Sequence, residues 1–234
     1  MVINYHRSII AITLAFFAVL FLNSGCSHSG LIPQSEMKQY QFKRLLLLPI
    51  KSSSDHHAKG ETVICELCGV SYTTEVVEDG AAAFLTDRVK LILDDGITSV
   101  ELIPDEQVQA TRNRILTMKP GPKSERELLT MIGRTLNADG MLSGSVYQFR
   151  NRVGYNYGVE TPAAVGFHLD LIEMESGNVI WSRRYEETQR ALSENLFSFG
   201  DFFRRKGKWL TAEDLAASGM EKVLQTIPIQ KAKK

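Results

Sequence analysis

The sequence lacks an excess of charge of either sign. Its 27 lysines and arginines balance its 27 aspartates and glutamates over 234 residues. A chain without net charge gives no reason to expect binding to nucleic acid or another polyanion. The sequence also has no internal repeat and no long low-complexity stretch. Its length, after the N-terminal segments described next, suits one well-buried domain and falls short of two typical ones.

Long hydrophobic runs are missing as well. The longest apolar segment, Ile9 to Leu22, is broken only by Thr13 and is too short, at about 14 residues, to cross roughly 30 Å of hydrocarbon as a helix. It follows Arg7 and precedes Asn23-Ser24-Gly25-Cys26. A positive start, a short apolar core and small residues before a cleavage point are typical of an export signal. Removing residues 1–25 takes away one arginine and no acid, which leaves the mature chain close to neutral.

This segment resembles a bacterial lipoprotein signal of the Leu-x-Gly-Cys type. The resemblance implies that residues 1–25 are removed and that Cys26 carries a diacylglyceryl group with palmitate-like chains. Asn23 departs from the pattern, because an apolar residue usually stands three places before the cysteine and Leu22 lies one place further out. Ordinary cleaved secretion and an uncleaved anchor are the alternatives. Ser27 follows the cysteine where Asp would signal inner-membrane retention, which implies the periplasmic face of a Gram-negative outer membrane.

Residues 26–42 are mostly polar and include Gly30 and Pro33, so we expect a flexible tether there. Residues 43–228 are expected to form the folded domain, with a polar insertion at 51–78 and a short basic tail at 229–234. The domain is predicted to be α/β (α+β), single and three-layer-like, with a mixed sheet. The predicted order is βαβαα, then antiparallel strands and a C-terminal helix.

Three patterns carry that prediction. Lys43 to Ile50 contains an unbroken apolar run, Leu45 to Leu48, which is closed by Pro49 and is typical of a strand buried on both faces. Residues 81–93, 105–115 and 125–136 have the spacing of amphipathic helices, and Ser124 and Thr211 are good N-caps. Residues 165–172 alternate like a half-buried strand, and the turn at Glu175–Asn178 predicts a hairpin with the strand that follows.

Two segments resemble one group of periplasmic α/β domains. The sequence signatures of this group are similar to residues 136–146 (LNADGMLSGSV) and 169–182 (LDLIEMESGNVIWS). The group includes the N-terminal domain of TolB, the curli-secretion lipoprotein CsgG and LpoB-type activators of peptidoglycan synthases. The resemblance implies their fold and says little about function, because the group includes a pore, a synthase activator and a Tol-system component. A CsgG-like channel subunit would need segments that become membrane hairpins. The only candidates are 51–78 and 187–210, and the second lacks the long period-two alternation of a barrel strand.

Cys65 and Cys68 form the one motif with metal or thiol chemistry, Cys65-Glu66-Leu67-Cys68-Gly69. Its spacing has the form of a zinc knuckle, but a tetrahedral site needs four ligands and there is no second cysteine pair. His56 and His57 could complete the site, although adjacent histidines rarely reach one ion. A small-loop disulfide, redox activity and free thiols are the alternatives.

Motifs of common catalytic sites are absent. We find no phosphate loop, dinucleotide fingerprint, His-Glu-x-x-His or Gly-x-Ser-x-Gly. Gly144, between Ser143 and Ser145, is expected to permit close strand packing. His168 and Asp170 share a strand face and could form an acid–base pair, but we interpret them as part of a solvated or capped polar face. The sequence therefore predicts a protein that is not an enzyme.

The segment 196–210 (LFSFGDFFRRKGKWL) is rich in aromatic and basic residues, which are enriched at interface cores. It could cap the sheet, lie against anionic lipid or bind a partner. Its candidate contact residues are Phe199, Phe202, Phe203, Arg204, Arg205 and Trp209.

Together these patterns predict a lipid-anchored, non-catalytic binding or assembly lipoprotein of the outer envelope, with an envelope protein as partner and no nucleic acid. A homo-oligomer, a CsgG-like secretion channel and a periplasmic thiol or zinc protein that uses Cys65 and Cys68 remain alternatives.

Overall fold

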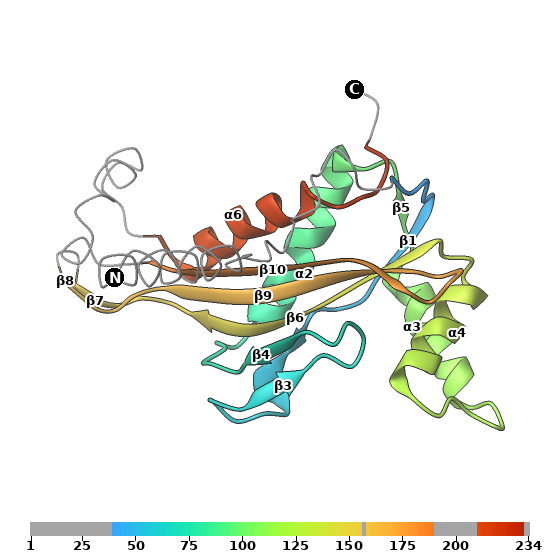
Figure 1. Ribbon diagram of the computed structural model, residues 1–234, viewed down its shortest axis with the longest axis horizontal. Helices are drawn as coiled ribbons and strands as arrows, with labels where there is room; N and C mark the ends of the chain where they lie inside the picture. The colour runs from blue at the N-terminus through green and yellow to red at the C-terminus, as the bar shows by residue number, and fades with distance from the viewer. Residues whose placement is uncertain (1–38, 156–157, 190–209, 232–234) are drawn as a thin grey trace, which may run out of the picture. The chain divides into compact units, whose positions relative to one another are not determined.

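The computed structural model describes residues 39–155, 158–189 and 210–231, which form a mixed sheet with helices on both faces (Figure 1). The strand order is β10-β9-β6-β1-β5, and β2 pairs with β6. Pairing is parallel from β5 through β1 to β6 and antiparallel from β6 through β9 to β10. The strands are β1 (Arg44–Leu47), β2 (Lys51–Ser52), β5 (Glu101–Leu102), β6 (Gly140–Arg150), β9 (Ala164–Glu173) and β10 (Val179–Thr188). The predicted fold class is confirmed.

Strand β1 lies between β5 and β6, which explains its unbroken apolar run. Leu45 and Leu46 are fully buried, so both faces of the strand are covered. The Asp139 carboxylate sets where the strand begins, because it accepts hydrogen bonds from the backbone N–H groups of Lys43 and Arg44 at 2.7 and 2.9 Å. The sequence prediction of a central buried strand is therefore confirmed.

Two helices, α2 (Ala81–Ile92) and α6 (Ala212–Leu224), pack together on one face of the sheet. Phe84 of α2 contacts Phe149 of β6 with ring centroids 6.1 Å apart. Gly219 of α6 lies against Tyr185 of β10 so closely that a Cβ there would be 2.3 Å from the ring. The predicted N-cap of α6 is confirmed, because the Thr211 side chain accepts a hydrogen bond from the Asp214 N–H.

The opposite face carries α3 (Asp105–Leu116) and α4 (Glu125–Thr135), as Figure 1 shows. The Ser124 side chain caps α4 as predicted by accepting a hydrogen bond from the Glu127 N–H at 3.1 Å. The core on this face joins residues of the sheet to those of α3 and α4: Leu46, Ile103, Val108, Ile115, Leu129, Ile132, Ala138, Met141, Ile172 and Met174.

A short helical turn, η3 (Leu93–Ile97), ends α2 at Gly96, whose φ of 83° suits glycine.

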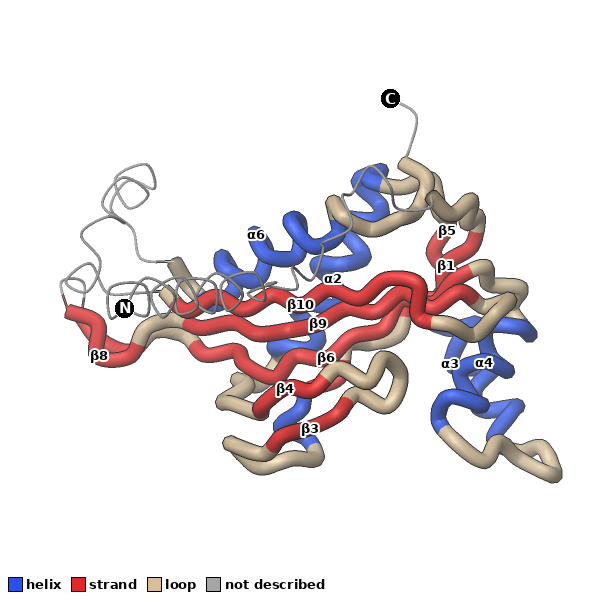
Figure 2. Tube along the Cα trace, viewed as in Figure 1, coloured by secondary structure: helices blue, strands red, loops and turns tan. Residues whose placement is uncertain are grey.

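The insertion at 51–78 is more ordered than its polar composition predicts. After the turn η2 (Ser53–Asp55), it forms a hairpin of β3 (Thr62–Ile64) and β4 (Ser71–Thr73) on the same side of the sheet as α3 and α4 (Figure 2). Backbone bonds then tie the chain to β6, since the N–H groups of Glu75 and Glu78 donate to the carbonyls of Tyr147 and Phe149. A second hairpin, β7 (Val153–Tyr155) with β8 (Gly158–Thr161), was also not predicted.

The burial of β9 corrects the sequence prediction. The alternation of Val165, Phe167, Leu169 and Leu171 predicted a half-buried strand, yet all residues from Ala164 to Ile172 are buried. The reason is that α6 packs against β9 on one face. On the other face, Tyr72 of the β3–β4 hairpin contacts His168, and Ile172 joins the core formed with α3 and α4. Polar residues on the second face are therefore enclosed.

The tether and domain meet at Tyr40, whose N–H donates to the Pro228 carbonyl at 2.8 Å and whose carbonyl accepts from Gln230. Residues 40–42, assigned by sequence to the tether, therefore join the fold. Within the described residues, no helix combines the length and apolar character that crossing a membrane requires. The predicted signal, Cys26 and the aromatic segment up to Trp209 lie outside the described residues.

Candidate functional site

The β3–β4 hairpin places its two cysteines in a tight turn. The Cys65 N–H donates to the Val70 carbonyl and the Gly69 N–H donates to the Cys65 carbonyl, both at 2.8 Å. Gly69 has a φ of 73°, in the left-handed region that glycine adopts without strain. The Cys-x-x-Cys-Gly segment therefore forms a tight turn.

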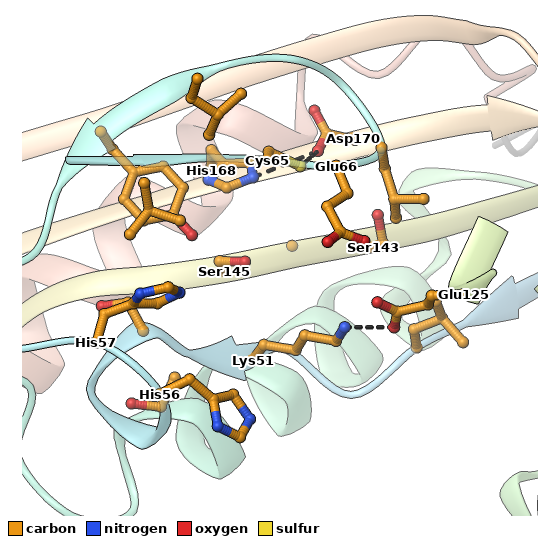
Figure 3. Close-up of a pocket in the computed structure, with 18 of the residues that line it drawn as sticks. Lys51, His56, His57, Cys65, Glu66, Glu125, Ser143, Ser145, His168 and Asp170 are labelled. Carbon is orange, nitrogen blue, oxygen red and sulfur yellow. Dashed lines mark hydrogen bonds and ion pairs between the residues drawn. The ribbon is translucent and has the colours of Figure 1, made fainter. Parts of the chain in front are cut away.

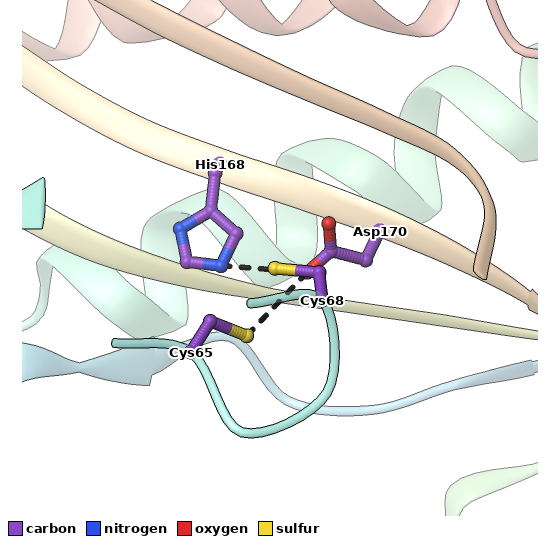
Figure 4. A group of neighbouring side chains, drawn as sticks. All are labelled: Cys65, Cys68, His168 and Asp170. Carbon is purple, nitrogen blue, oxygen red and sulfur yellow. Dashed lines mark hydrogen bonds and ion pairs between the residues drawn. The ribbon is translucent and has the colours of Figure 1, made fainter. Parts of the chain in front are cut away.

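Strand β9 supplies two further side chains to the same place. His168 and Asp170 are two residues apart, so both project from one face of the strand toward the hairpin. Each is 1% exposed. One ligand atom from each of Cys65, Cys68, His168 and Asp170 can be chosen so that all four lie within 4.8 Å of one another (Figure 4). We call these four residues the CCHD cluster.

The Asp170 carboxylate is at the centre of the CCHD cluster. Its Oδ1 accepts a hydrogen bond from the Ser182 hydroxyl at 2.6 Å. Its Oδ2 lies 3.4 Å from His168 Nε2 and 3.8 Å from Cys65 Sγ. Neither ring nitrogen of His168 has a hydrogen-bond partner among the described residues. Ser182 of β10 thus fixes Oδ1 of the carboxylate, while Oδ2 faces one nitrogen, His168 Nε2, and one sulfur, Cys65 Sγ.

The electrostatics of the cluster follow from burial and from its neighbours. Burial would raise the pKa of the Cys65 thiol, but His168 and Cys68 outweigh burial and lower it. Burial raises the pKa of Cys68, and its hydrogen bond with Cys65 adds to the rise. Burial would lower the pKa of His168, yet Asp170 and Cys65 raise it to about 9. Burial would raise the pKa of Asp170, but His168 and Ser182 lower it.

Aromatic rings and two arginines hold the hairpin over β9. Tyr72 of β4 stacks on Tyr147 of β6 at 4.7 Å and contacts the His168 ring at 5.2 Å. Arg184 donates to the Tyr147 hydroxyl at 2.9 Å and to the Ser71 carbonyl at 3.3 Å. Arg126 of α4 donates to the Leu67 carbonyl at 2.6 Å. The loop that carries the cysteines is therefore tied to both α4 and the sheet.

A pocket of about 530 Å³ opens beside the cluster (Figure 3). Cys65, His168 and Asp170 line its inner end, while Lys51, which pairs with Glu125 of α4, lines it further out. This pocket gives solutes a route from solvent to the buried side chains.

The proposed histidine ligands take no part in the CCHD cluster. His56 and His57 line the pocket, and His57 Nδ1 lies 3.3 Å from Glu61 Oε2. The structure instead brings His168 and Asp170 to the cysteines. The sequence interpretation of that pair as a solvated or capped polar face is wrong in its solvated part, because each of the two side chains is 1% exposed.

Other sequence predictions fare differently. A Cβ at Gly144 would lie 2.5 Å from the His168 carbonyl oxygen, which confirms that this glycine permits close strand packing. Cys65 and Cys68 are free thiols in the structure. A disulfide between them remains a prediction, as does lipidation of Cys26. The candidate contact residues lie outside the described part of the chain: Phe199, Phe202, Phe203, Arg204, Arg205 and Trp209.

The cluster is suited to three kinds of chemistry: metal binding, disulfide formation and nucleophilic attack by a thiolate. Two thiols, an imidazole and a carboxylate can together hold a metal ion. The thiols alone can form a disulfide, and the thiol with the lowered pKa is the more nucleophilic of the pair.

No protein-family model matches this chain, and no curated protein matches its sequence. Among solved structures, it is similar to the PelC dodecamer from Paraburkholderia phytofirmans, with 16% identity, a TM-score of 0.45 and coverage of 85% of this chain and 96% of that one. It is also similar to the LpoB C-terminal domain from Escherichia coli, with 16% identity, a TM-score of 0.42 and coverage of 67% and 93%. Such values are too low to establish a family or a function. LpoB belongs to the group that the sequence resembles, and membership of this chain in that group remains a prediction.

Proposed function

We propose that this chain is a lipid-anchored, non-catalytic accessory protein of the outer envelope that acts by binding a partner protein. The observation that carries the proposal is the N-terminal sequence, in which a short apolar core precedes Gly25-Cys26-Ser27. A diacylated cysteine would hold the domain at the membrane, because each buried methylene contributes about 0.8 kcal/mol. Residues 27–39 would then set how far the domain reaches from the bilayer.

The domain offers a sheet edge to a partner. Strand β10 pairs only with β9 within the described sheet, so its other edge has no strand beside it there. Its exposed positions include Arg183, Arg184 and Glu186. Arg184 and Glu186 pair with each other, and charged side chains along an edge hinder indiscriminate strand pairing, so a partner at this edge would have to be specific.

The aromatic segment is the second proposed contact. Replacing Phe202, Phe203 and Trp209 together by Ser is expected to leave a folded, soluble protein that no longer cross-links to its partner in intact cells. Large aromatic side chains contribute most of the binding free energy at many interfaces. The measurement is in-cell cross-linking followed by mass spectrometry, and Lys206→Ser with Lys208→Ser is the matched control. An insoluble aromatic variant would show that these residues belong to the core, which contradicts the proposal.

The residue after the cysteine gives a separate test of location. Ser27→Asp is expected to move the protein from the outer to the inner membrane, because Asp at this position is associated with retention. Density-gradient separation of the two membranes measures the shift, and Ser27→Ala serves as the control that should stay in the outer membrane. Unchanged location of the Asp variant would argue against sorting by this residue.

A further inference from the structure

We propose that the CCHD cluster binds one zinc ion, which fastens the β3–β4 hairpin to strand β9. This inference goes beyond the accessory role and does not depend on it. The ligand atoms are Cys65 Sγ, Cys68 Sγ, His168 Nε2 and Asp170 Oδ2. Four protein ligands without an open position are typical of a structural site, so the ion holds the fold together and takes no part in turnover.

The donor set selects the metal. Thiolates favour soft or borderline ions, and two thiolates with an imidazole and a carboxylate oxygen suit zinc in tetrahedral geometry. Calcium and magnesium prefer all-oxygen sites, so this cluster excludes them. The Cys65-to-Gly69 turn supplies two of these donors from one loop, as structural zinc sites commonly do.

Two of the six distances between ligand atoms are close to those of a zinc tetrahedron, and all six are within 4.8 Å. Bonds of about 2.3 Å to sulfur and about 2.0 Å to nitrogen and oxygen give a sulfur–oxygen edge of roughly 3.5 Å and a nitrogen–oxygen edge of roughly 3.3 Å. The Cys65 Sγ to Asp170 Oδ2 distance is 3.8 Å, and the His168 Nε2 to Asp170 Oδ2 distance is 3.4 Å. Both separations are long for strong hydrogen bonds and close to the edges of the metal site.

The buried imidazole points independently to a ligand. His168 is 1% exposed, and both ring nitrogens lack a hydrogen-bond partner among residues 39–155, 158–189 and 210–231. Buried polar atoms are rarely left unsatisfied. A metal bond to Nε2 satisfies the nitrogen that faces Asp170 and the sulfurs (Figure 4).

Ser182 supports the site from outside. Its hydroxyl holds Oδ1 of Asp170 at 2.6 Å, which orients Oδ2 toward the other donors. Hydrogen bonds of this kind fix metal-binding carboxylates, and their loss typically weakens metal affinity 10- to 100-fold, an order-of-magnitude range. A disulfide between Cys65 and Cys68 would leave both ring nitrogens of His168 without a hydrogen bond among the described residues. The arrangement therefore favours metal over disulfide.

Zinc would connect parts of the chain 105 residues apart, from Cys65 to Asp170. The pocket lined by Cys65, His168 and Asp170 gives the ion its route of access. In the hairpin, few apolar side chains are buried, and Ile64 is 65% exposed. The ion would therefore supply the anchoring that this segment lacks in hydrophobic contacts.

The test is metal analysis of the full-length protein purified without chelator, combined with intact-mass counting of thiols. We expect one zinc per chain and no mass loss from a Cys65–Cys68 disulfide. After removal of zinc, Co²⁺ should give the visible absorption of a tetrahedral, thiolate-bound ion. Both measurements use the unaltered chain, so they do not depend on a variant that folds.

Variants then assign the ligands. His168→Ala is expected to weaken zinc binding at least about 100-fold and Ser182→Ala about 10- to 100-fold. The matched control is His56→Ala with His57→Ala, because these residues line the same pocket outside the cluster, and it should keep full zinc content. Absence of zinc with an oxidised cysteine pair would overturn the proposal, as would loss of zinc in the His56/His57 control or its retention in His168→Ala.

Discussion

Replacing Cys26 by Ser is expected to remove all palmitate label from the protein and to abolish its place in the outer membrane. The physical reason is that the diacylglyceryl group is attached to the thiol of Cys26, and the hydroxyl of the serine variant cannot take the place of that thiol. A single acyl chain binds membranes only weakly, so two chains are needed for a stable anchor. Metabolic labelling with palmitate and membrane separation measure the two effects.

The matched control is Cys65→Ser with Cys68→Ser, which removes the other two cysteines of the chain. This variant should keep its label and its membrane location, whatever happens to its stability. Label that persists in the Cys26→Ser protein would show attachment elsewhere, and an unlabelled unaltered protein would remove the basis of the proposed function.

Replacing Asp170 by Ala is expected to lower the free energy of unfolding by about 3–5 kcal/mol in the presence of chelator. Removing one partner of a buried ion pair leaves the other charge without compensation, which typically has this effect. Asp170 is 1% exposed and lies 3.4 Å from His168 Nε2, and it also accepts the Ser182 hydrogen bond. Urea denaturation followed by circular dichroism measures the loss.

The stabilising contributions of Asp170 and His168 depend on pH in opposite directions. The pKa of Asp170 is lowered, so its stabilising contribution is present above its ordinary value of 3.8 and is lost as pH falls through the lower folded value. The pKa of His168 is raised to about 9, so its contribution is present below 6.5 and is lost as pH rises through about 9. The stability difference between unaltered protein and Asp170→Asn should therefore be largest between pH 3.8 and 6.5.

Ser182→Ala is the control for the hydrogen bond alone. Losing one hydrogen bond to a charged group is expected to lower stability by about 1.5–3 kcal/mol, less than the loss of the carboxylate itself. An Asp170→Ala protein as stable as the Ser182→Ala protein would contradict the assignment of a buried ion pair. A difference that does not vary with pH would contradict it too.

Much of the fold could be predicted because local signals agreed with the tertiary structure. The apolar run of β1, the caps Ser124 and Thr211 and the turn before β10 each fix an element through nearby residues alone. The β3–β4 and β7–β8 hairpins were harder, because short polar strands lack the period-two pattern that identifies longer ones. The burial of β9 depends on what covers each face, which no pattern within the strand reveals.

The candidate site was half predictable. Cys65 and Cys68 stand out because their spacing and the following glycine have a chemical meaning within five residues. His168 and Asp170 were recognised as sharing a face, yet their link to the cysteines depends on where the insertion folds over the sheet. Two observations together could have identified them. The cysteine pair supplies only two of four ligands, and a polar His-x-Asp pair stands inside an otherwise apolar strand.

The most direct test of the proposed role is the intact mass of the native protein extracted from membranes. We expect a chain that begins at Cys26 and carries a diacylglyceryl group on its sulfur. A chain with an unmodified N-terminus, or one recovered from the cytosol, would contradict the account of a membrane-held protein that acts by binding.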